Sequence, residues 1–396
     1  MITCRSLTKV FGPRAREALA LLERGESRAA AQAATGCTIA VRGVDFEVAR
    51  GELFVIMGLS GSGKSTLLRM LNRLVEPTRG SVLIDGQDVT AMGERELREL
   101  RGRRVSMVFQ HFALLPHRTV LENVAYPLRL HGSPNQRERA QWALAEVGLG
   151  DWGDAYPGEL SGGMRQRVGL ARALATEADV MLMDEPFSAL DPLIRRQVQD
   201  LLIGLQAELR KTIVFVTHDL NEAMRLGDRI MMLRDGAVVQ CASGSEILAS
   251  PADEYVADFV ADVDRSRVLT AADVMREARI TASPGEAPEL VLRRLEEAEA
   301  NGIYVLDQER RIVGVARDDV LAQAIRAGRR ELSSELLVDD YATTDPSRPL
   351  VELCQLVGRH SVPLAVIDEA GRLLGVVPRA AVLSALAAPE REPSYA

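Results

Sequence analysis

Residues 53–66 read LFVIMGLSGSGKST, five apolar residues followed at once by a glycine-rich turn and a Lys-Ser-Thr sequence. The apolar run predicts a buried strand, and residues 65–74 predict a helix after the turn. Glycines let backbone N–H groups converge on phosphate oxygens, and a helix N-terminus adds its positive dipole. The stretch therefore fits the P-loop motif. Its expected nucleotide-binding residues are Gly58, Ser60, Gly61, Ser62, Gly63, Lys64, Ser65 and Thr66.

Four side chains have expected roles at the phosphates. Lys64 would place a positive charge between the β- and γ-phosphates, and the Ser65 hydroxyl would ligate Mg²⁺. A second apolar run, VMLM at residues 180–183, ends in Asp184 and Glu185. We expect Asp184 to hold Mg²⁺ through water and Glu185 to polarise the attacking water as general base. A strand-end Asp-Glu pair alone would equally suit a solvated turn, but the P-loop before it favours catalysis.

Short apolar runs alternate with helical stretches over the first part of the chain. Besides residues 53–57, they are residues 105–109 (VSMVF), 180–183 (VMLM) and 212–216 (TIVFV). This alternation predicts an α/β domain with a mostly parallel sheet, residues 1–262. Between Gly12 and Thr38, a segment rich in Ala, Arg and Glu predicts a helical insertion that protrudes between two strands.

The remaining part, residues 263–396, contains an internal repeat. Residues 304–315 read YVLDQERRIVGV and residues 365–376 read AVIDEAGRLLGV, which align without a gap. Each copy predicts a strand, an Asp turn, a second strand and a helix. Such a unit cannot bury its own apolar face, so two copies should pack as a pseudo-symmetric α+β pair. The alternative is one α+β domain with two similar hairpins.

Composition limits the classes of partner. With 396 residues, 47% of them hydrophobic, the chain can bury a full core and a second, smaller domain. A net charge of −8 argues against nucleic acid as the main partner, because phosphate binding needs a basic surface. The widely spaced Cys4, Cys37, Cys241 and Cys354 suit a reducing, cytosolic compartment rather than disulfides or a metal cluster. Without a spanning run or a signal peptide, membrane attachment would need another protein.

Residues 160–167, LSGGMRQR, decide the class of NTPase. A Ser-Gly-Gly turn that opens a helix offers amides and a hydroxyl to a γ-phosphate, here from Ser161, Gly162 and Gly163. The stretch resembles the signature motif of ABC ATPases. One bound ATP does not need a second phosphate-binding turn, whereas two chains paired head to tail could each cover the other's P-loop. The resemblance therefore implies a homodimer with two composite ATP sites.

The other ABC motifs occur in the order of that family. By resemblance, Gln110 is the Q-loop glutamine that reaches Mg²⁺ and the attacking water, and Asp191 belongs to the D-loop across the dimer. His218 matches the switch histidine at the γ-phosphate, and Phe11 takes the place of the aromatic that stacks on adenine. The implied catalytic residues are Glu185, His218 and Gln110. The implied metal-binding residues are Ser65, Gln110 and Asp184.

Nearly the whole chain resembles the ATPase of glycine betaine/proline betaine (quaternary amine) importers. The resemblance rests on the helical insertion, on the amino-acid sequences of residues 51–80 and 107–128, and on a C-terminal repeat similar to a tandem CBS pair. It implies an ATPase at the cytoplasmic face of the inner membrane, peripheral to separate permease subunits and served indirectly by a substrate-binding protein. Alternatives are an importer ATPase for another solute, such as an amino acid or choline, and a soluble non-transport ABC ATPase.

Two further features follow from this resemblance. A groove around residues 111–120 should receive the permease's coupling helix, unless the segment is a plain surface loop. CBS pairs often bind adenine nucleotides, or in this family report ionic strength or a cyclic dinucleotide. Asp319 is the candidate ribose ligand, but the aligned residue in the second copy is Ala380, which argues against symmetric binding.

A basic cluster in the same region suggests a different contact. Arg326, Arg329 and Arg330 could meet anionic lipid and loosen with salt, although a solvated helix end explains them equally well. We hypothesise that the pair inhibits ATPase activity at low ionic strength.

Overall fold

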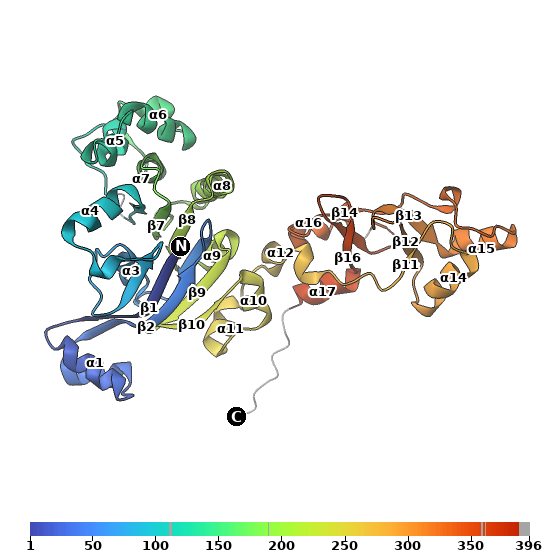
Figure 1. The fold of residues 1–396 in the computed structure, drawn as a ribbon, viewed down its shortest axis with the longest axis horizontal. Coiled ribbons are helices and arrows are strands. Elements are labelled where there is room, and N and C mark those ends of the chain that lie inside the picture. The colour runs from blue at the N-terminus through green and yellow to red at the C-terminus, as the bar shows by residue number, and fades with distance from the viewer. Residues whose placement is uncertain (111–112, 189, 358, 361, 388–396) are drawn as a thin grey trace. The chain divides into compact units, whose positions relative to one another are not determined.

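The computed structural model describes residues 1–396 except 111–112, 189, 358, 361 and 388–396. The chain forms two compact units, Met1–Val260 and Ala261–Ala396, each of which is described by itself (Figure 1). Among the described residues, no helix combines the length and the apolar composition needed to cross a bilayer.

The first unit is built around a six-stranded sheet in the order β10-β9-β3-β8-β7-β6. All neighbouring strands are parallel except β10, which pairs antiparallel with β9. β3, β7 and β8 are buried at every position, as expected of central strands covered on both faces. The strands are β3 (Leu53–Met57), β6 (Val105–Val108), β7 (Val180–Asp184), β8 (Thr212–Thr217), β9 (Arg229–Arg234) and β10 (Ala237–Ala242). The predicted parallel α/β sheet is confirmed.

A four-stranded antiparallel sheet, β2-β1-β4-β5, shares its hydrophobic core with the first sheet. The rings of Phe46 on β2 and Phe54 on β3 stack across this core, with centroids 5.3 Å apart. The strands are β1 (Ile2–Phe11), β2 (Thr38–Val48), β4 (Arg79–Ile84) and β5 (Gln87–Asp88). Between β1 and β2 the chain forms two helices, α1 (Ala15–Glu23) and α2 (Arg28–Thr35), which project beyond the strands in Figure 1. The predicted helical insertion is therefore confirmed.

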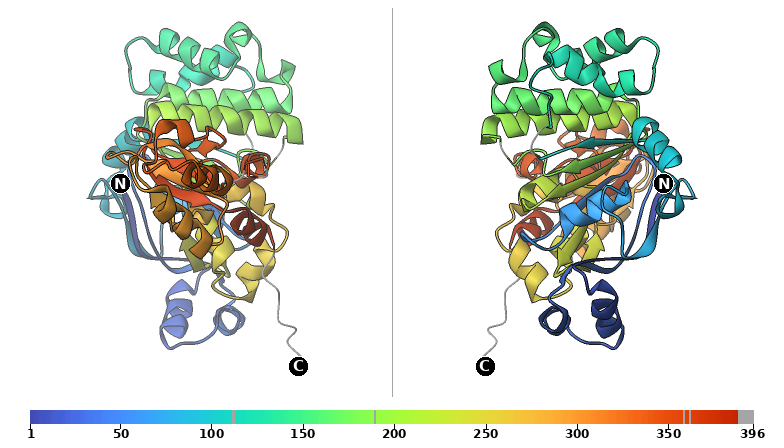
Figure 2. Two further views of the ribbon diagram at one scale, coloured as in Figure 1. Left: turned by 90° about the vertical axis from the view of Figure 1, so that its right-hand side faces the viewer. Right: turned by 90° about the vertical axis from the view of Figure 1, so that its left-hand side faces the viewer.

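Helices connect the parallel strands of the first unit. α3 (Lys64–Leu71) follows β3 and ends earlier than the predicted residue 74. Between β6 and β7, the helices α5, α6 and α7 form a layer of their own at the top of Figures 1 and 2. The helices are α4 (Glu94–Arg103), α5 (Val120–Leu130), α6 (Gln136–Glu146), α7 (Gly162–Ala175), α8 (Pro192–Leu209), α9 (Leu220–Leu226), α10 (Gly244–Ala249) and α11 (Glu254–Val260). Short 3-10 helices are η1 (Val89–Ala91), η2 (Gly150–Trp152) and η3 (Pro157–Glu159).

The second unit contains two three-stranded sheets of the same design, β11-β12-β13 and β14-β15-β16. Val305 lies opposite Gly314 in one, Val366 lies opposite Gly375 in the other, and the register shifts at the next residue in both. The predicted repeat is therefore confirmed. The strands are β11 (Thr281–Ala282), β12 (Gly302–Leu306), β13 (Ile312–Arg317), β14 (Thr343–Thr344), β15 (Leu364–Ile367) and β16 (Leu373–Val377). The helices are α12 (Arg265–Val268), α13 (Ala271–Val274), α14 (Pro288–Glu297), α15 (Asp318–Arg326), η4 (Ser334–Leu336), α16 (Leu350–Leu353) and α17 (Arg379–Leu386).

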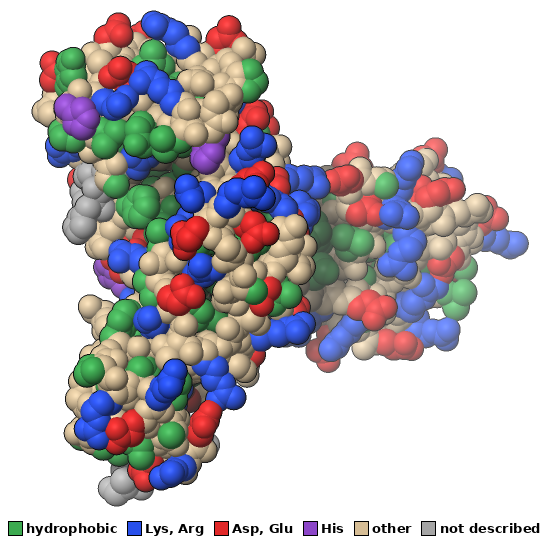
Figure 3. All heavy atoms as spheres, turned by 60° about the vertical axis from the view of Figure 1, so that its left-hand side comes forward, with side chains coloured by type: hydrophobic (Ala, Val, Ile, Leu, Met, Phe, Trp, Pro, Cys, Tyr) green, Lys and Arg blue, Asp and Glu red, His purple; other side chains and the backbone are tan. Residues whose placement is uncertain are grey.

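Charged side chains of both signs are interspersed over the face drawn in Figure 3. In the first unit, two ion pairs attach the insertion to the sheets. Arg79 on β4 pairs with Glu23 of α1, and Arg28 of α2 pairs with Asp235 in the β9–β10 turn. Exposed pairs contribute only about 0–1 kcal/mol each, so they orient the insertion more than they stabilise it.

Candidate active site

The P-loop connects β3 to α3, and two of its glycines are required by the backbone. Gly58 has a φ of 148° and Gly63 a φ of 99°, which residues with a side chain rarely adopt. A Cβ on Gly63 would lie 2.1 Å from the carbonyl oxygen of Ala40 on β2, and one on Gly58 would lie 2.2 Å from that of Leu233 on β9. The loop is therefore pressed against the backbone of two strands, which fixes its shape.

The side chain of Lys64 is folded into this loop. The residue is 4% exposed, and its Nζ donates to the carbonyl oxygens of Gly58 at 2.9 Å and Leu59 at 3.0 Å. Burial lowers the pKa of Lys64, and the nearby carboxylates of Glu185 and Asp184 oppose that effect. A lysine thus lies inside a glycine loop at a helix N-terminus, the arrangement that phosphate binding needs.

Asp184 ends β7 and is fully buried. Its Oδ2 accepts hydrogen bonds from Nε and Nη2 of Arg69 on α3, at 3.2 and 3.0 Å. Its Oδ1 has no hydrogen-bond partner among the described residues. A buried carboxylate oxygen without a partner is costly unless it binds something. The oxygen therefore fits the contact with hydrated Mg²⁺ expected from the sequence.

Arg69 is a site residue that the sequence analysis missed. It lies four residues after Ser65 on α3, and residues at this spacing share one face of a helix. That spacing was the available signal, but no motif points to it. The contact itself joins positions 115 residues apart in the chain, so only the fold shows it.

The three predicted catalytic residues meet at the carboxyl end of β7. Oε2 of Glu185 lies 3.1 Å from Nδ1 of His218, which follows β8, and accepts a hydrogen bond from Nε2 of Gln110 at 3.5 Å. Glu185 has a φ of 43°, an uncommon conformation for a residue with a side chain that often marks functional sites. The His218 side chain is 57% exposed, so the cluster can meet a ligand from solvent.

Ser161 caps the N-terminus of α7, where its Oγ accepts a hydrogen bond from the backbone N–H of Met164 at 3.3 Å. Gly162 and Gly163 form the first turn of that helix. α7 packs against α8 (Figure 2), and a Cβ on Gly163 would lie 2.7 Å from Cγ2 of Ile194. Within the part of the chain that the structure describes, no hydrogen bond joins this turn to the P-loop.

The other two predicted ATP-binding residues lie at element ends. Phe11 ends β1, is 43% exposed, and has Nζ of Lys9 4.8 Å from its ring centre. The ring is therefore partly exposed, with the Lys9 ammonium over one of its faces. Asp191 caps α8, and its Oδ1 accepts the N–H groups of Leu193 and Ile194, both at 3.1 Å. Neither residue is hydrogen-bonded to the Glu185 cluster among the described atoms.

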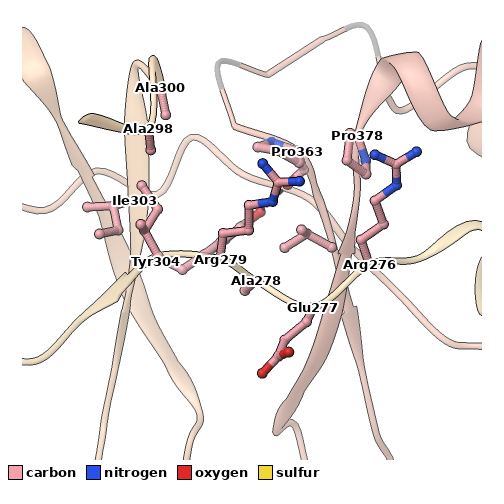
Figure 4. A pocket seen from close by; sticks show the side chains of 13 residues that line it. Arg276, Glu277, Ala278, Arg279, Ala298, Ala300, Ile303, Tyr304, Pro363 and Pro378 are labelled. Carbon is pink, nitrogen blue, oxygen red and sulfur yellow. Dashed lines mark hydrogen bonds between the residues drawn. The ribbon is translucent and has the colours of Figure 1, made fainter. Parts of the chain in front are cut away.

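The second unit has a cavity of about 300 Å³ between its two repeats (Figure 4). The segment Arg276–Ile280, the start of β12 and residues beside β15 and β16 line it. Figure 4 shows the guanidinium groups of Arg276 and Arg279 on the side of Pro363 and Pro378, whereas Glu277 points the opposite way. Neither arginine has an ion-pair partner among the described residues. Two guanidinium groups and the carboxylate of Glu277 thus belong to the lining of this cavity.

The CBS residues singled out in the sequence lie elsewhere. Asp319 pairs with Arg317 and lines a separate hollow beside α14, so it does not reach the cavity. Arg326 ends α15, and Arg329 pairs with Glu335. The predicted basic cluster is therefore partly neutralised by its own neighbours.

Residues 41–188 match the ABC transporter family, and residues 333–388 match the CBS domain. The glycine betaine/carnitine transport ATP-binding protein of Listeria monocytogenes is 46% identical over 391 residues, which cover 98% of each chain. The glycine betaine/proline betaine transport ATP-binding protein of Salmonella typhimurium is 46% identical over 96% of each chain. A solved ATP-binding cassette, dimeric and bound to ADP and Pi, covers 61% of this chain and 98% of its own, with 35% identity and a TM-score of 0.52.

The expected resemblance and ATPase activity are confirmed by these relatives. The match extends over both units, so it includes the C-terminal pair as well as the P-loop domain. A P-loop facing a strand-end Asp-Glu pair is also what ATP hydrolysis requires. The chain belongs to the family of ATP-binding subunits of glycine betaine/proline betaine ABC transporters, and it is the ATP-hydrolysing subunit of an importer.

Proposed function

We propose that two copies of this chain bind two ATP molecules at a shared interface and use their hydrolysis to drive the import of glycine betaine-type solutes. The observation that carries the dimer is a second glycine-containing helix start, Ser161–Gly163, which shares no hydrogen bond with the P-loop among the described residues. A turn that its own P-loop does not use can cover that of a second copy. The dimeric state of the solved cassette supports this arrangement.

Mg²⁺ is the second proposed cofactor, and the donor set fits it. The Ser65 hydroxyl, the Gln110 amide oxygen and the unpartnered Oδ1 of Asp184, reached through water, are the hard oxygen ligands that this ion prefers. The ion would supply charge that neutralises the β- and γ-phosphates. Lys64 would exchange its contacts with Gly58 and Leu59 for phosphate oxygens. Adenine is proposed to stack on Phe11.

Glu185 is the proposed general base. His218 at 3.1 Å and Gln110 at 3.5 Å hold its carboxylate at the open end of the sheet, where it can accept a proton from an attacking water. As the proton moves to Glu185, the water oxygen bonds to the γ-phosphorus and the bond to ADP breaks. His218 would also contact the γ-phosphate, which links its position to the presence of ATP.

The chain is proposed to act at the cytoplasmic face of the inner membrane, attached through permease subunits. The segment after Gln110 is the proposed contact for a permease helix, although its residues 111 and 112 lie outside the described part of the structure. From residue 115 onward the segment is well fixed. The backbone N–H of Leu115 donates to Oδ1 of the buried Asn123. Nδ2 of Asn123 donates to the carbonyl oxygens of Leu115, Arg118 and Thr119. Such a preformed loop suits docking.

Uptake of labelled glycine betaine tests the proposal. Cells lacking this gene, but supplied with the wild-type gene or with Glu185→Gln, should be compared at low and high salt. We expect uptake with the wild-type gene only. Unchanged uptake in the deletion strain, with no redundant importer present, would point to another solute such as choline, or to an ATPase without a transport role. A substrate-binding protein would deliver the solute, so these outcomes do not depend on this chain touching it.

A second candidate function is regulation by an anion in the C-terminal cavity. The carrying observation is that Arg276 and Arg279, without ion-pair partners among the described residues, line one cavity together with Tyr304. An adenine nucleotide fits this chemistry, and anionic lipid at Arg326 and Arg330 is the competing contact. ATPase rates of the reconstituted transporter should be measured across salt concentrations. Loss of salt dependence in Arg276→Gln/Arg279→Gln favours the cavity, whereas loss only in Arg326→Gln/Arg330→Gln favours lipid.

A further inference from the structure

Arg195 connects two loops of the ATPase unit that no sequence motif joins. It lies in the first turn of α8, and its Nη2 donates to the carbonyl oxygen of Leu190 at 3.2 Å. Its Nη1 donates to Oδ2 of Asp219 at 3.2 Å, and its Nε lies 3.6 Å from Oε1 of Glu222. One guanidinium therefore contacts the loop before α8 and the start of α9.

The α9 side of this contact sets the position of His218. Asp219 follows His218 directly, and its two carboxylate oxygens accept hydrogen bonds from different groups. Oδ1 caps α9 by accepting the N–H groups of Asn221 and Glu222, while Oδ2 accepts from Arg195. The backbone N–H of Asp219 donates to Oγ1 of Thr217, whose hydroxyl donates to the buried Glu222. A shift of Arg195 is thus transmitted to the residues on both sides of His218.

On α8, the contact of Arg195 is with the loop that carries Asp191. Leu190 precedes Asp191, and Asp191 caps the helix to which Arg195 belongs. Because Arg195 bonds the Leu190 carbonyl, the loop cannot move freely while Asp219 holds the guanidinium. In the proposed dimer, this loop faces the ATP site of the partner chain, whereas His218 faces the chain's own γ-phosphate.

We propose that Arg195 is a positioning residue that couples the two ATP sites. It transmits a displacement of the Leu190–Asp191 loop, set by the partner's site, to His218 and through it to Glu185 at 3.1 Å. Charge-assisted hydrogen bonds of a planar guanidinium suit this role, because one rigid group donates to the Leu190 carbonyl and to Asp219 at fixed angles and lies beside Glu222 as an ion pair. The inference rests on the proposed dimer, since a single ATP site would leave Arg195 nothing to couple.

The test compares Arg195→Gln with Arg225→Gln in the full-length chain, reconstituted with its permease. Arg225 is a matched control, because it also bridges α8 and α9, through Asp200 and Gln199, but it contacts neither Leu190 nor Asp219. ATPase rates are measured over a range of ATP concentrations, with ATP affinity and melting temperature as separate readouts. We expect Arg195→Gln to lower kcat about tenfold and to bring the Hill coefficient down to 1. ATP affinity should change less than about twofold.

Each outcome decides the question. Arg225→Gln should lower the melting temperature by a similar amount while keeping the wild-type Hill coefficient. Arg195→Lys keeps the charge but not the planar group that bonds Leu190 and Asp219 together, so it should recover part of kcat and little of the cooperativity. Equal kinetics in the two glutamine variants would overturn the proposal and leave Arg195 a packing residue. A wild-type Hill coefficient of 1 would also overturn the proposal, because it would leave no coupling between the two sites for Arg195 to carry.

Discussion

Replacing Arg69 with methionine should leave a buried carboxylate without a donor. Asp184 is fully buried, and both hydrogen bonds to its Oδ2 come from Arg69. Removing one partner of a buried pair typically costs about 3–5 kcal/mol, because the remaining charge is uncompensated. The Arg69 side chain is 44% exposed, so water can reach part of the vacated space and the cost should be about 2–3 kcal/mol.

Thermal unfolding of the full-length chain without nucleotide measures this cost. A domain of this size loses about 2–4 °C per kcal/mol, so the transition of the first unit should fall by about 4–12 °C. Methionine keeps much of the volume of the arginine stem, which limits the packing loss. Adding Asp184→Asn to Arg69→Met should recover most of the stability, because a neutral amide leaves no unpaired charge.

Two results would refute this reasoning. A melting temperature for Arg69→Met within about 1 °C of the wild type would mean that Asp184 does not depend on this donor. A double variant as unstable as Arg69→Met alone would mean that lost packing, rather than the unpaired carboxylate, causes the change. The wild type and Asp184→Asn, measured under the same conditions, complete the double-mutant cycle.

Three shorter predictions follow, two from the first unit and one from a pair of cysteines, Cys241 in the first unit and Cys354 in the second. Gly63→Ala should destabilise the P-loop by at least about 2 kcal/mol and abolish ATP binding. Gly61 also has a positive φ but has open space around it, so Gly61→Ala should cost less stability. Equal melting temperatures of the two variants would contradict this prediction. Glu185→Gln should slow hydrolysis at least about 100-fold with ATP binding retained, and a smaller loss of rate would exclude a general base there. Iodoacetamide at pH 8 should label the exposed Cys354 before Cys241, because burial raises the pKa of the Cys241 thiol and leaves less of it as thiolate. Peptide mass spectrometry measures the two labelling rates. Faster labelling of Cys241 would contradict the prediction.

The sequence was most informative where local pattern and chemistry coincide. Residues 53–66 gave β3, the P-loop and the start of α3 within a few residues, because an apolar strand, a glycine turn and a helix follow each other directly. The repeat was also visible, since both hairpins keep the same spacing between Asp and Gly-Val. Motif order likewise anticipated the meeting of Gln110, Glu185 and His218.

Contacts between distant segments could not be predicted in this way. Arg69 and Arg195 belong to no recognised pattern, because each acts by meeting a carboxylate supplied by another element. The strand order of the central sheet is likewise set by packing and not by chain order. The position of Asp319, which the family resemblance suggested as a ribose ligand, also depends on the fold: it pairs with Arg317 and lines a hollow separate from the cavity.

The strand that carries the P-loop is completed by chain synthesised long after it. β3 has β8 and β9 as its neighbours, so residues 53–57 cannot form their strand pairs until residues 212–217 and 229–234 have been synthesised. Pairing over such separations is slow, and meanwhile an apolar strand with two open edges stays exposed on the nascent chain. A ribosome that stalls between β6 and β8 would therefore release a fragment prone to aggregate and unable to hold nucleotide. A chain that has reached Ala242 contains every strand of this sheet.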